Sequence, residues 1–249
     1  MIDLQKIIEG LNQSIPQLSI DCVIFGFHNQ ELKVLLSKLP AIDLWAVQGG
    51  FIRKTEDIDQ AAARILEERT GLKGIFLEQF HAFGKASRPS IAFLKEAFKS
   101  ISDSVAIESI PFLTQRFISI GYYSLVDFLQ VKPVPSVSYE RSEWFDIQKL
   151  PTLGLDHAEM IEKALKTLQH SLDYALIGFN LMPETFTMSE LQKLYETILG
   201  ETTSRNNFQR KMLDMDILER LEKKFTGGAH KAPYLYRFKR YNEHKQPIF

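Results

Sequence analysis

The chain has 249 residues, of which 45% are hydrophobic and 24% charged, and its formal net charge is −1. This composition is typical of a folded globular protein and too apolar for a disordered one. No segment has the ~18 consecutive apolar residues of a membrane helix, and the first residues lack the apolar core of a signal peptide. A single cysteine excludes an internal disulfide framework. We therefore expect a cytoplasmic protein of one large or two modest domains, with no membrane partner.

Strand and helix patterns alternate along the first part of the chain. Two strands over 21–27 and 31–37 form an expected hairpin, and a third strand that begins at Trp45 is expected to break at Gly49. Apolar residues spaced by three and four predict a helix over 58–70. The remaining elements are expected to be strands over 75–83, 116–126 and 142–145 and a helix over 157–172.

A long connection over 85–115 separates two of these expected strands. Its stretch 90–100 has helix-like spacing of apolar residues. A connection of this length is either an insertion with its own role or a packed decoration, and the sequence leaves both interpretations open.

The rest of the chain follows a different order of elements. A helix over 188–199, with Ser189 as its candidate N-cap, precedes a second amphipathic helix over 204–215. A glycine pair at Gly227 then leads to a short alternating strand over 234–238. Helix, turn, helix and a glycine hairpin with a basic edge form the order of a winged helix-turn-helix. The expected domains are therefore 1–175 and 176–249.

Charge divides along the chain in the same way. Residues 201–249 contain 11 Lys and Arg against 6 Asp and Glu, a net charge of +5, which leaves −6 on the residues before them. A basic C-terminal module suits the phosphate backbone, and Arg, Asn and Gln on its second helix can pair with base edges. The alternative is a solvated basic surface on a dimerisation domain. The candidate DNA-binding residues are Arg205, Asn206, Asn207, Arg210, Lys211, His230, Lys231 and Tyr234.

Fixed spacings between Gly50 and Leu72 carry the most specific signal. They resemble the Nudix box of the Nudix hydrolases, G-x(5)-E-x(7)-R-E-U-x-E-E-x-G-U, where U is a bulky aliphatic residue. The resemblance implies an α+β protein, with an N-terminal Nudix-like α/β/α sandwich built on a mixed sheet and a C-terminal winged helix-turn-helix. The residues that match the box without insertion are Gly50, Glu56, Arg64, Leu66, Glu68, Gly71 and Leu72.

Two departures from the box bear on catalysis. In the family, glutamates after the arginine bind divalent metal, and here Ile65 and Arg69 replace two of the three. Positions 65, 68 and 69 share one helix face. Isoleucine offers no oxygen ligand, and arginine places a fixed positive charge where the metal should sit. The resemblance suggests that Glu56 is kept for a structural ion pair with Arg64. We expect no catalytic residue, no metal, no cofactor and no hydrolase activity; the alternative is an active pyrophosphohydrolase acting on a nucleoside diphosphate derivative.

Both halves together resemble the Nudix-related transcriptional regulators. That resemblance implies a homodimer that binds palindromic, double-stranded operator DNA and responds to a small-molecule effector, a sugar or a nucleotide sugar such as ADP-ribose. A third interpretation is a catalytically inactive scaffold that binds another protein. The sequence names neither the effector nor the direction of its response. The candidate effector-pocket residues are Trp45, Gln48, Arg69 and His81.

Overall fold

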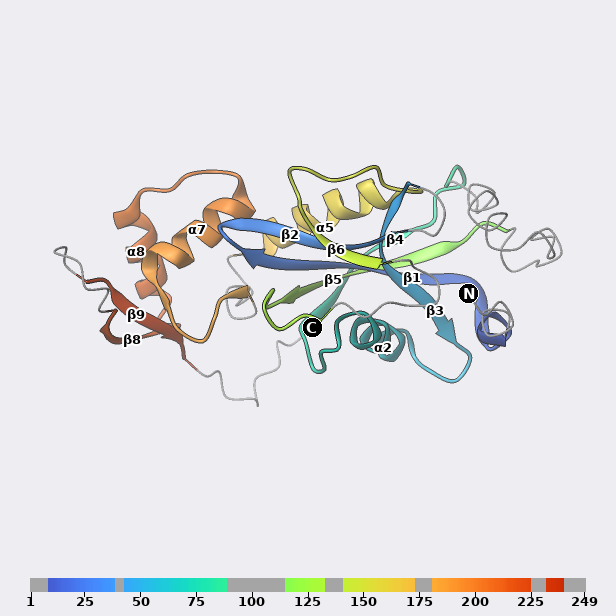
Figure 1. Cartoon of the computed structure of the whole chain (residues 1–249), viewed down its shortest axis with the longest axis horizontal. Helices are drawn as coiled ribbons and strands as arrows, with labels where there is room; N and C mark the ends of the chain where they lie inside the picture. Colours follow the sequence, from blue (N-terminus) through green and yellow to red (C-terminus); the bar gives the residue numbers. More distant parts are fainter. Residues whose placement is uncertain are drawn as a thin grey trace.

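The computed structural model describes residues 9–38, 43–88, 115–132, 141–172, 181–224 and 232–239. The molecule is elongated, with a sheet between two helices at one end and a smaller unit of helices and short strands at the other (Figure 1). No helix in the described part of the chain is long and apolar enough to cross a membrane. Most of the expected insertion, residues 89–114, lies outside the described residues.

The larger unit is built on a six-stranded mixed sheet with the strand order β4-β5-β1-β3-β2-β6. Within it β1 and β5 run parallel, and the other neighbouring strands are antiparallel. The strands are β1 (Ser14–His28), β2 (Glu31–Lys38), β3 (Trp45–Arg53), β4 (Leu77–Phe83), β5 (Ile118–Val126) and β6 (Arg141–Asp146).

One helix covers each face of this sheet, α2 (Ile58–Thr70) on one side and α5 (His157–Ser171) on the other (Figure 1). Alternation along β1 explains the two layers. Cys22 packs in a cluster with residues of α2, and Val23 packs in a second cluster with residues of α5. The predicted α/β/α sandwich with a mixed sheet is confirmed.

The glycine pair Gly49-Gly50 does not break β3, contrary to the expectation. The strand continues through both residues to Arg53. A Cβ at position 49 would lie 2.5 Å from Oδ1 of Asp21, and one at position 50 would lie 2.9 Å from the Ile65 side chain. The glycines therefore allow two close approaches, one on each face of the sheet, instead of a turn.

The smaller unit has the element order of a winged helix. A three-stranded sheet has the strand order β7-β9-β8, and a tight turn at Gly200, with φ +74°, joins its two helices. These elements lie at the orange and red end of Figure 1. They are β7 (Phe186–Thr187), α7 (Met188–Leu199), α8 (Arg205–Asp214), β8 (Leu218–Lys223) and β9 (Tyr234–Phe238).

The helix α7 begins earlier than a Ser189 cap would allow. Its N-cap is Thr187, whose hydroxyl accepts a hydrogen bond from the Glu190 backbone N–H at 3.2 Å. The Glu190 carboxylate in turn accepts from the Thr187 backbone N–H at 2.6 Å. Ser189 also has a suitable residue three positions later, Gln192, but the Gln192 amide donates to Glu196 and to the Thr203 carbonyl instead, so the reciprocal box forms at Thr187.

The two units share one hydrophobic core. A single cluster of buried side chains includes Leu168 of α5 together with Leu194 and Ile198 of α7. Two hydrogen bonds reinforce the seam: the Gln169 side-chain amide donates to the Ile198 carbonyl at 2.8 Å, and the Thr197 hydroxyl donates to the Gln30 carbonyl at 3.2 Å. The sheet unit therefore packs directly on the winged helix.

Candidate effector and nucleic-acid sites

The centre of the box remnant is an ion pair between Arg64 of α2 and Glu56. The guanidinium donates to both Glu56 carboxylate oxygens, at 2.6 and 2.9 Å, and to the Phe51 carbonyl at 2.9 Å. The hydrogen bond from Arg64 holds the pKa of Glu56 below its usual value, and the same bond raises the pKa of Arg64. The pair that the resemblance suggested is present and ties the loop before α2 to the helix.

The three positions that bind metal in the family do not fit a divalent cation here. Ile65 is 1% exposed and packs under Gly50. Arg69 donates a hydrogen bond to the Gly49 carbonyl at 3.0 Å. Glu68 supplies the one carboxylate, and Arg64 already lies 3.2 Å from it. Across the described residues, no group of three or more His, Cys, Asp or Glu is placed to hold a metal ion.

The four predicted effector residues lie on opposite faces of the sheet. Trp45 belongs to the cluster on the α5 side, and His81 on the same side has its Nε2 3.4 Å from Nζ of Lys163. Gln48 is fully buried and accepts a hydrogen bond from the Ser37 hydroxyl at 2.8 Å. Residues three apart on a strand point to opposite faces, so β3 separates Trp45 from Gln48, and Arg69 reaches the sheet from α2. The structure does not bring the four together.

A polar cluster that sequence reasoning missed lies on the α5 side, between β1, β5 and the start of α5. The Arg88 guanidinium is 2.8 Å from the Asp156 carboxylate and 3.6 Å from that of Asp21. The Ser119 hydroxyl donates to Asp21. His157 is buried beside them, and this burial lowers its pKa. The one signal in the sequence is Asp21 itself, a charged residue inside an apolar run.

The helix α8 presents a polar face to solvent and an apolar face to its own unit. Phe208 and Met212 are buried, and the Phe208 ring meets Tyr195 of α7 at 5.3 Å between centroids. The five candidate DNA-binding residues on this helix are all exposed. No ion pair to Arg205 or Arg210 occurs among the described residues. The exposed five are Arg205, Asn206, Asn207, Arg210 and Lys211.

The short strands beside α8 carry two cations that sequence reasoning did not single out. The Arg220 guanidinium lies 4.6 Å from the centre of the Tyr234 ring, and the Lys223 amine lies 5.3 Å from it. Tyr234 is 39% exposed, so this group faces solvent. The predicted wing residues His230 and Lys231 lie outside the described residues.

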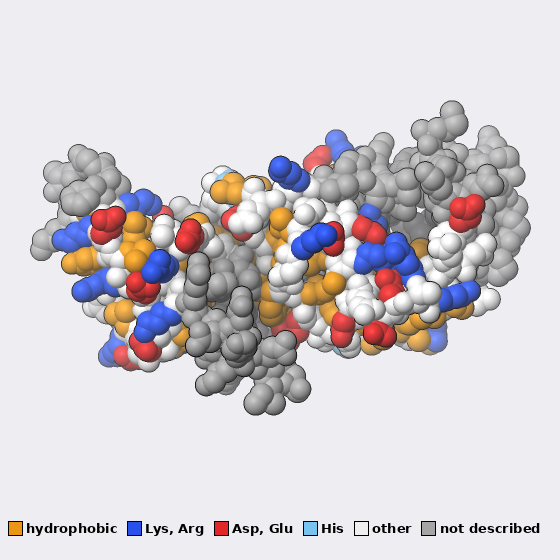
Figure 2. Space-filling model, turned by 90° about the horizontal axis from the view of Figure 1, so that it is seen from below, with side chains coloured by type: hydrophobic (Ala, Val, Ile, Leu, Met, Phe, Trp, Pro, Cys, Tyr) orange, Lys and Arg blue, Asp and Glu red, His pale blue; other side chains and the backbone are white. Residues whose placement is uncertain are grey.

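Other basic residues of the winged helix are paired within it. Arg237 lies 2.8 Å from Glu219, and Lys239 lies 2.5 Å from Asp216. Figure 2 shows positive and negative side chains interleaved over this end of the molecule. The charges of Arg237 and Lys239 are therefore matched within the module, whereas Arg205 and Arg210 of α8 belong to neither of these pairs.

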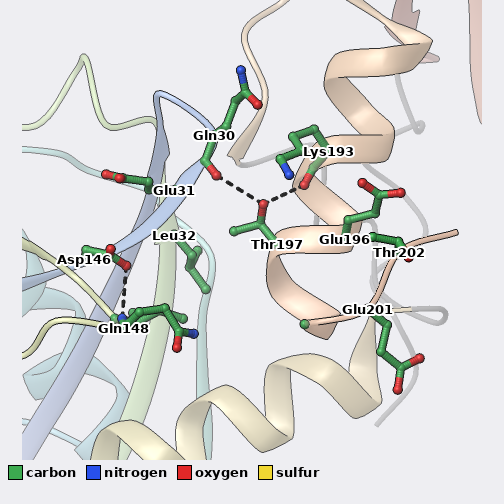
Figure 3. A pocket seen from close by; sticks show the side chains of 12 residues that line it. Gln30, Glu31, Leu32, Asp146, Gln148, Lys193, Glu196, Thr197, Glu201 and Thr202 are labelled. Carbon is green, nitrogen blue, oxygen red and sulfur yellow. Dashed lines mark hydrogen bonds between the residues drawn. The ribbon is translucent and has the colours of Figure 1, made fainter.

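A cavity of about 310 Å³ lies at the seam between the sheet unit and α7. Figure 3 shows it between the β1–β2 turn and the last turns of α7, beside the hydrogen bond from Thr197 to Gln30. Residues from the end of β6 close the third side. Acidic, amide and hydroxyl groups dominate the lining, among them Glu31, Asp146, Gln148, Glu196, Glu201 and Thr202.

Comparison with known proteins connects these two units to two families. A model described as the NUDIX domain matches residues 15–164, and a model described as the NrtR DNA-binding winged helix domain matches residues 178–238. A curated relative from Acinetobacter baylyi, the ADPR responsive transcriptional repressor NtrR, is 28% identical over 90% of this chain and 82% of its own length.

Solved structures agree with this assignment. Shewanella oneidensis NrtR in complex with a 27mer DNA is 27% identical, with a TM-score of 0.69 over 90% of this chain and 94% of that one. A MutT/nudix family protein from Enterococcus faecalis, 19% identical, has the same fold with a TM-score of 0.65 over 95% of this chain and 94% of its own. This chain belongs to the NUDIX family, and it carries an NrtR-type winged helix behind its NUDIX domain.

Proposed function

We propose that this protein is a ligand-responsive transcriptional repressor, whose Nudix-like domain binds a small-molecule effector and thereby controls binding of the winged helix to operator DNA. The observation that carries the proposal is α8, a helix anchored by Phe208 and Met212 with exposed Arg and Asn side chains on its outer face. The DNA complex of Shewanella NrtR, a relative of the same architecture, supports it.

In this proposal α8 enters the major groove. Its exposed Arg205 and Arg210 suit bidentate pairing with guanine, and Asn206 and Asn207 suit adenine. Arg220 and Lys223 beside the Tyr234 ring would meet backbone phosphates. A homodimer places two such helices on the half-sites of a palindrome, so a rotation between them removes one half of the contacts. A DNA-binding regulator acts where the chromosome lies, so the proposal includes a cytoplasmic location.

The proposal also holds that the Nudix-like domain has no hydrolase activity. Its support is the chemistry of the three former metal positions, where a buried isoleucine, a guanidinium and a carboxylate already bound by Arg64 stand. The effector belongs to the class of sugars, nucleotide sugars or ADP-ribose; the Acinetobacter relative is described as ADPR responsive. An effector changes DNA binding only through different affinities for the two states of the protein.

DNA binding is tested by gel shift with the DNA upstream of the protein's own gene, titrated with salt. The double variant Arg210→Ala/Lys211→Ala should weaken binding and reduce the magnitude of the slope of log K against log[salt] by roughly 4, because each protomer of the dimer loses two cations. The matched control, Lys73→Ala/Lys166→Ala, removes two exposed cations of the sheet unit and should leave both quantities unchanged. Absence of operator-specific binding at physiological salt would overturn the proposal.

Hydrolysis is tested separately, with ADP-ribose and Mg²⁺ or Mn²⁺. We expect no turnover above the rate without protein. Turnover that Glu68→Gln abolishes would instead support the rival function, a pyrophosphohydrolase with an unusual ligand set.

A further inference from the structure

We propose that the polar cluster on the α5 side of the sheet, formed by Asp21, Arg88, Ser119, Asp156 and His157 and here named the Asp21 cluster, is the effector site, and that it binds a small neutral polyhydroxylated ligand such as a monosaccharide. The regulatory role of this site rests on the proposed function. Its binding chemistry stands on the structure alone.

The Asp21 cluster gathers hydrogen-bonding groups from four segments. Asp21 lies on β1, Ser119 on β5, Asp156 and His157 at the start of α5, and Arg88 follows β4. The Arg88 guanidinium bridges the two carboxylates, at 2.8 Å to Asp156 and 3.6 Å to Asp21. This juxtaposition supplies acceptors and donors at one point, as recognition of several adjacent hydroxyl groups requires.

One buried group of the cluster has no partner. His157 is 5% exposed, and its Nδ1 makes no hydrogen bond to any described residue. His157 follows Asp156 directly at the start of α5, and Arg88 links Asp156 to Asp21. Buried polar atoms are rarely left unpaired, because each one loses its hydrogen bond to water. A ligand hydroxyl would complete the hydrogen bonding of this ring nitrogen.

The cluster is open enough to be reached. The side chains of Asp21 and Asp156 keep 13% and 15% of their surface exposed. Beside Asp21 the neighbouring strand has Gly49, and the Asp21 carboxylate lies so close to this residue that a Cβ there would be 2.5 Å from Oδ1. Gly49 thus gives the Asp21 carboxylate room at the face of the sheet, and both carboxylates keep part of their surface in contact with solvent.

An aromatic surface borders the same point. Phe51 follows Gly49 by two residues on β3 and so projects from the same face. Its ring lies 5.6 Å from that of Phe117, and the Phe117 carbonyl accepts a hydrogen bond from Arg88 at 3.2 Å. A sugar presents hydroxyl groups at its edge and C–H groups on its face, so polar groups beside an aromatic ring match both parts of it.

The charge balance favours a neutral ligand over a diphosphate. Two carboxylates surround the single guanidinium, which is already paired with both of them. The nearby Lys85 lies 2.8 Å from Glu159, so its charge is also matched. Bringing the negative charges of a pyrophosphate to this point would add repulsion with these two carboxylates, while the charges of Arg88 and Lys85 are already matched.

The position of the cluster gives it a route to the winged helix. Asp156 and His157 begin α5, and Gln169 near the other end of the same helix donates to the Ile198 carbonyl of α7. Leu168 packs in the core shared with α7. A shift of α5 at its first turn is therefore transmitted through one rigid element to the unit that carries α8.

The test is isothermal titration calorimetry of the full chain with D-xylose, L-arabinose, D-ribose, D-glucose and D-galactose, one at a time, and with ADP-ribose. We expect at least one monosaccharide to bind and ADP-ribose to bind more weakly or not at all. Asp156→Asn and Ser119→Ala should each weaken monosaccharide binding, by about tenfold or more for the charged partner. Glu162→Gln, an exposed position elsewhere on α5, is the matched control and should bind as the wild type does.

Thermal melting of each variant separates loss of the site from loss of the fold, and Ser119→Ala serves if Asp156→Asn fails to fold. Binding of ADP-ribose alone, of none of the sugars, or of a sugar with equal affinity by the cluster variants would overturn the inference. The gel shift without ligand is independent of these outcomes: a protein that binds operator DNA but no monosaccharide contradicts this inference and leaves the proposed function standing. A protein that binds a sugar through the Asp21 cluster but binds no operator DNA contradicts the proposed function and leaves the binding chemistry of this site standing.

Discussion

At the scale of single residues, Arg64 has a structural role within the box remnant. Its guanidinium joins Glu56, Glu68 and the Phe51 carbonyl, so it holds the loop before α2 against the helix. That role needs only the ion pair and the carbonyl, and neither depends on a metal. A structural reason to keep Gly50, Glu56 and Arg64 therefore remains after Ile65 and Arg69 have replaced the metal ligands.

Replacing Arg64 by methionine should destabilise the protein by about 2 kcal/mol, because Glu56 would be left half-buried without its cation. The Arg64 and Glu56 side chains are 20% and 12% exposed, so solvent screens this pair only in part. The measurement is urea unfolding. Arg53→Met is the control, since Arg53 is 51% exposed and lies 3.6 Å from Glu68; an equal loss in both variants would contradict the explanation.

His157 makes a second prediction at this scale, on pH. Burial lowers its pKa below the ordinary value of 6.5, so between the folded and unfolded pKa values the unfolded chain binds more protons. The contribution of His157 to stability is therefore complete above about pH 6.5 and decreases as the pH falls toward the folded pKa. Urea midpoints of the wild type and of His157→Phe, measured from pH 7.5 to 5, should converge as the solution is acidified. Parallel curves would exclude this role.

At the scale of elements, the winged helix depends on how α7 and α8 begin and end. Thr187 and Glu190 cap α7 reciprocally, Gly200 ends it in a left-handed conformation, and Ser204 caps α8 through the Asn207 backbone N–H at 3.3 Å. Gly200 and Ser204 thus fix the two ends of the turn between the helices. The conformation of this turn sets the direction in which α8 presents its exposed side chains.

Thr187→Ala should cost about 1 kcal/mol of stability, because the Glu190 backbone N–H loses its acceptor. Thermal melting followed by circular dichroism measures the loss. Thr202→Ala, an exposed threonine of the turn before α8, should melt with the wild type. A Thr187 variant as stable as this control would show that the box contributes nothing to α7.

At the scale of the whole molecule, the shared core makes the sheet unit and the winged helix mechanically one body. Leu168, Leu194 and Ile198 are buried in a single cluster that spans both units. A rearrangement of one unit is therefore transmitted to the other through packing. This continuity suits a regulator in which the sensing and DNA-binding sites lie at different ends of the chain.

Unfolding should accordingly follow one transition. Both tryptophans, Trp45 and Trp144, lie in the sheet unit, so their fluorescence reports that unit, while circular dichroism also reports α7 and α8. The two signals should coincide in urea. Leu168→Ala should move both to lower urea together, by an amount equivalent to about 2–5 kcal/mol. A circular-dichroism transition that persists after the fluorescence change would contradict a common core.

Local patterns along the sequence were sufficient for much of the fold. The hairpin at Asn29-Gln30 is present, with both residues at positive φ, and α2 ends at Gly71 as its spacing predicted. These features depend on residues a few positions apart, so their physical causes lie within the printed segment. The same holds for the amphipathic pattern that buries Phe208 and exposes Arg210.

The sequence by itself therefore determined the order of most elements, though not the short strands β7 and β8, together with the box remnant, its replaced metal-ligand positions and the outward face of α8, since each follows from local spacing. Only the tertiary structure decided which face of the sheet each effector candidate occupies and which charges meet. Arg88 and Asp156 are separated by 68 positions, and Asp21 and Ser119 by 98. Their meeting depends on the parallel register of β1 with β5 and on the docking of α5, and neither leaves a trace in the spacing of neighbouring residues.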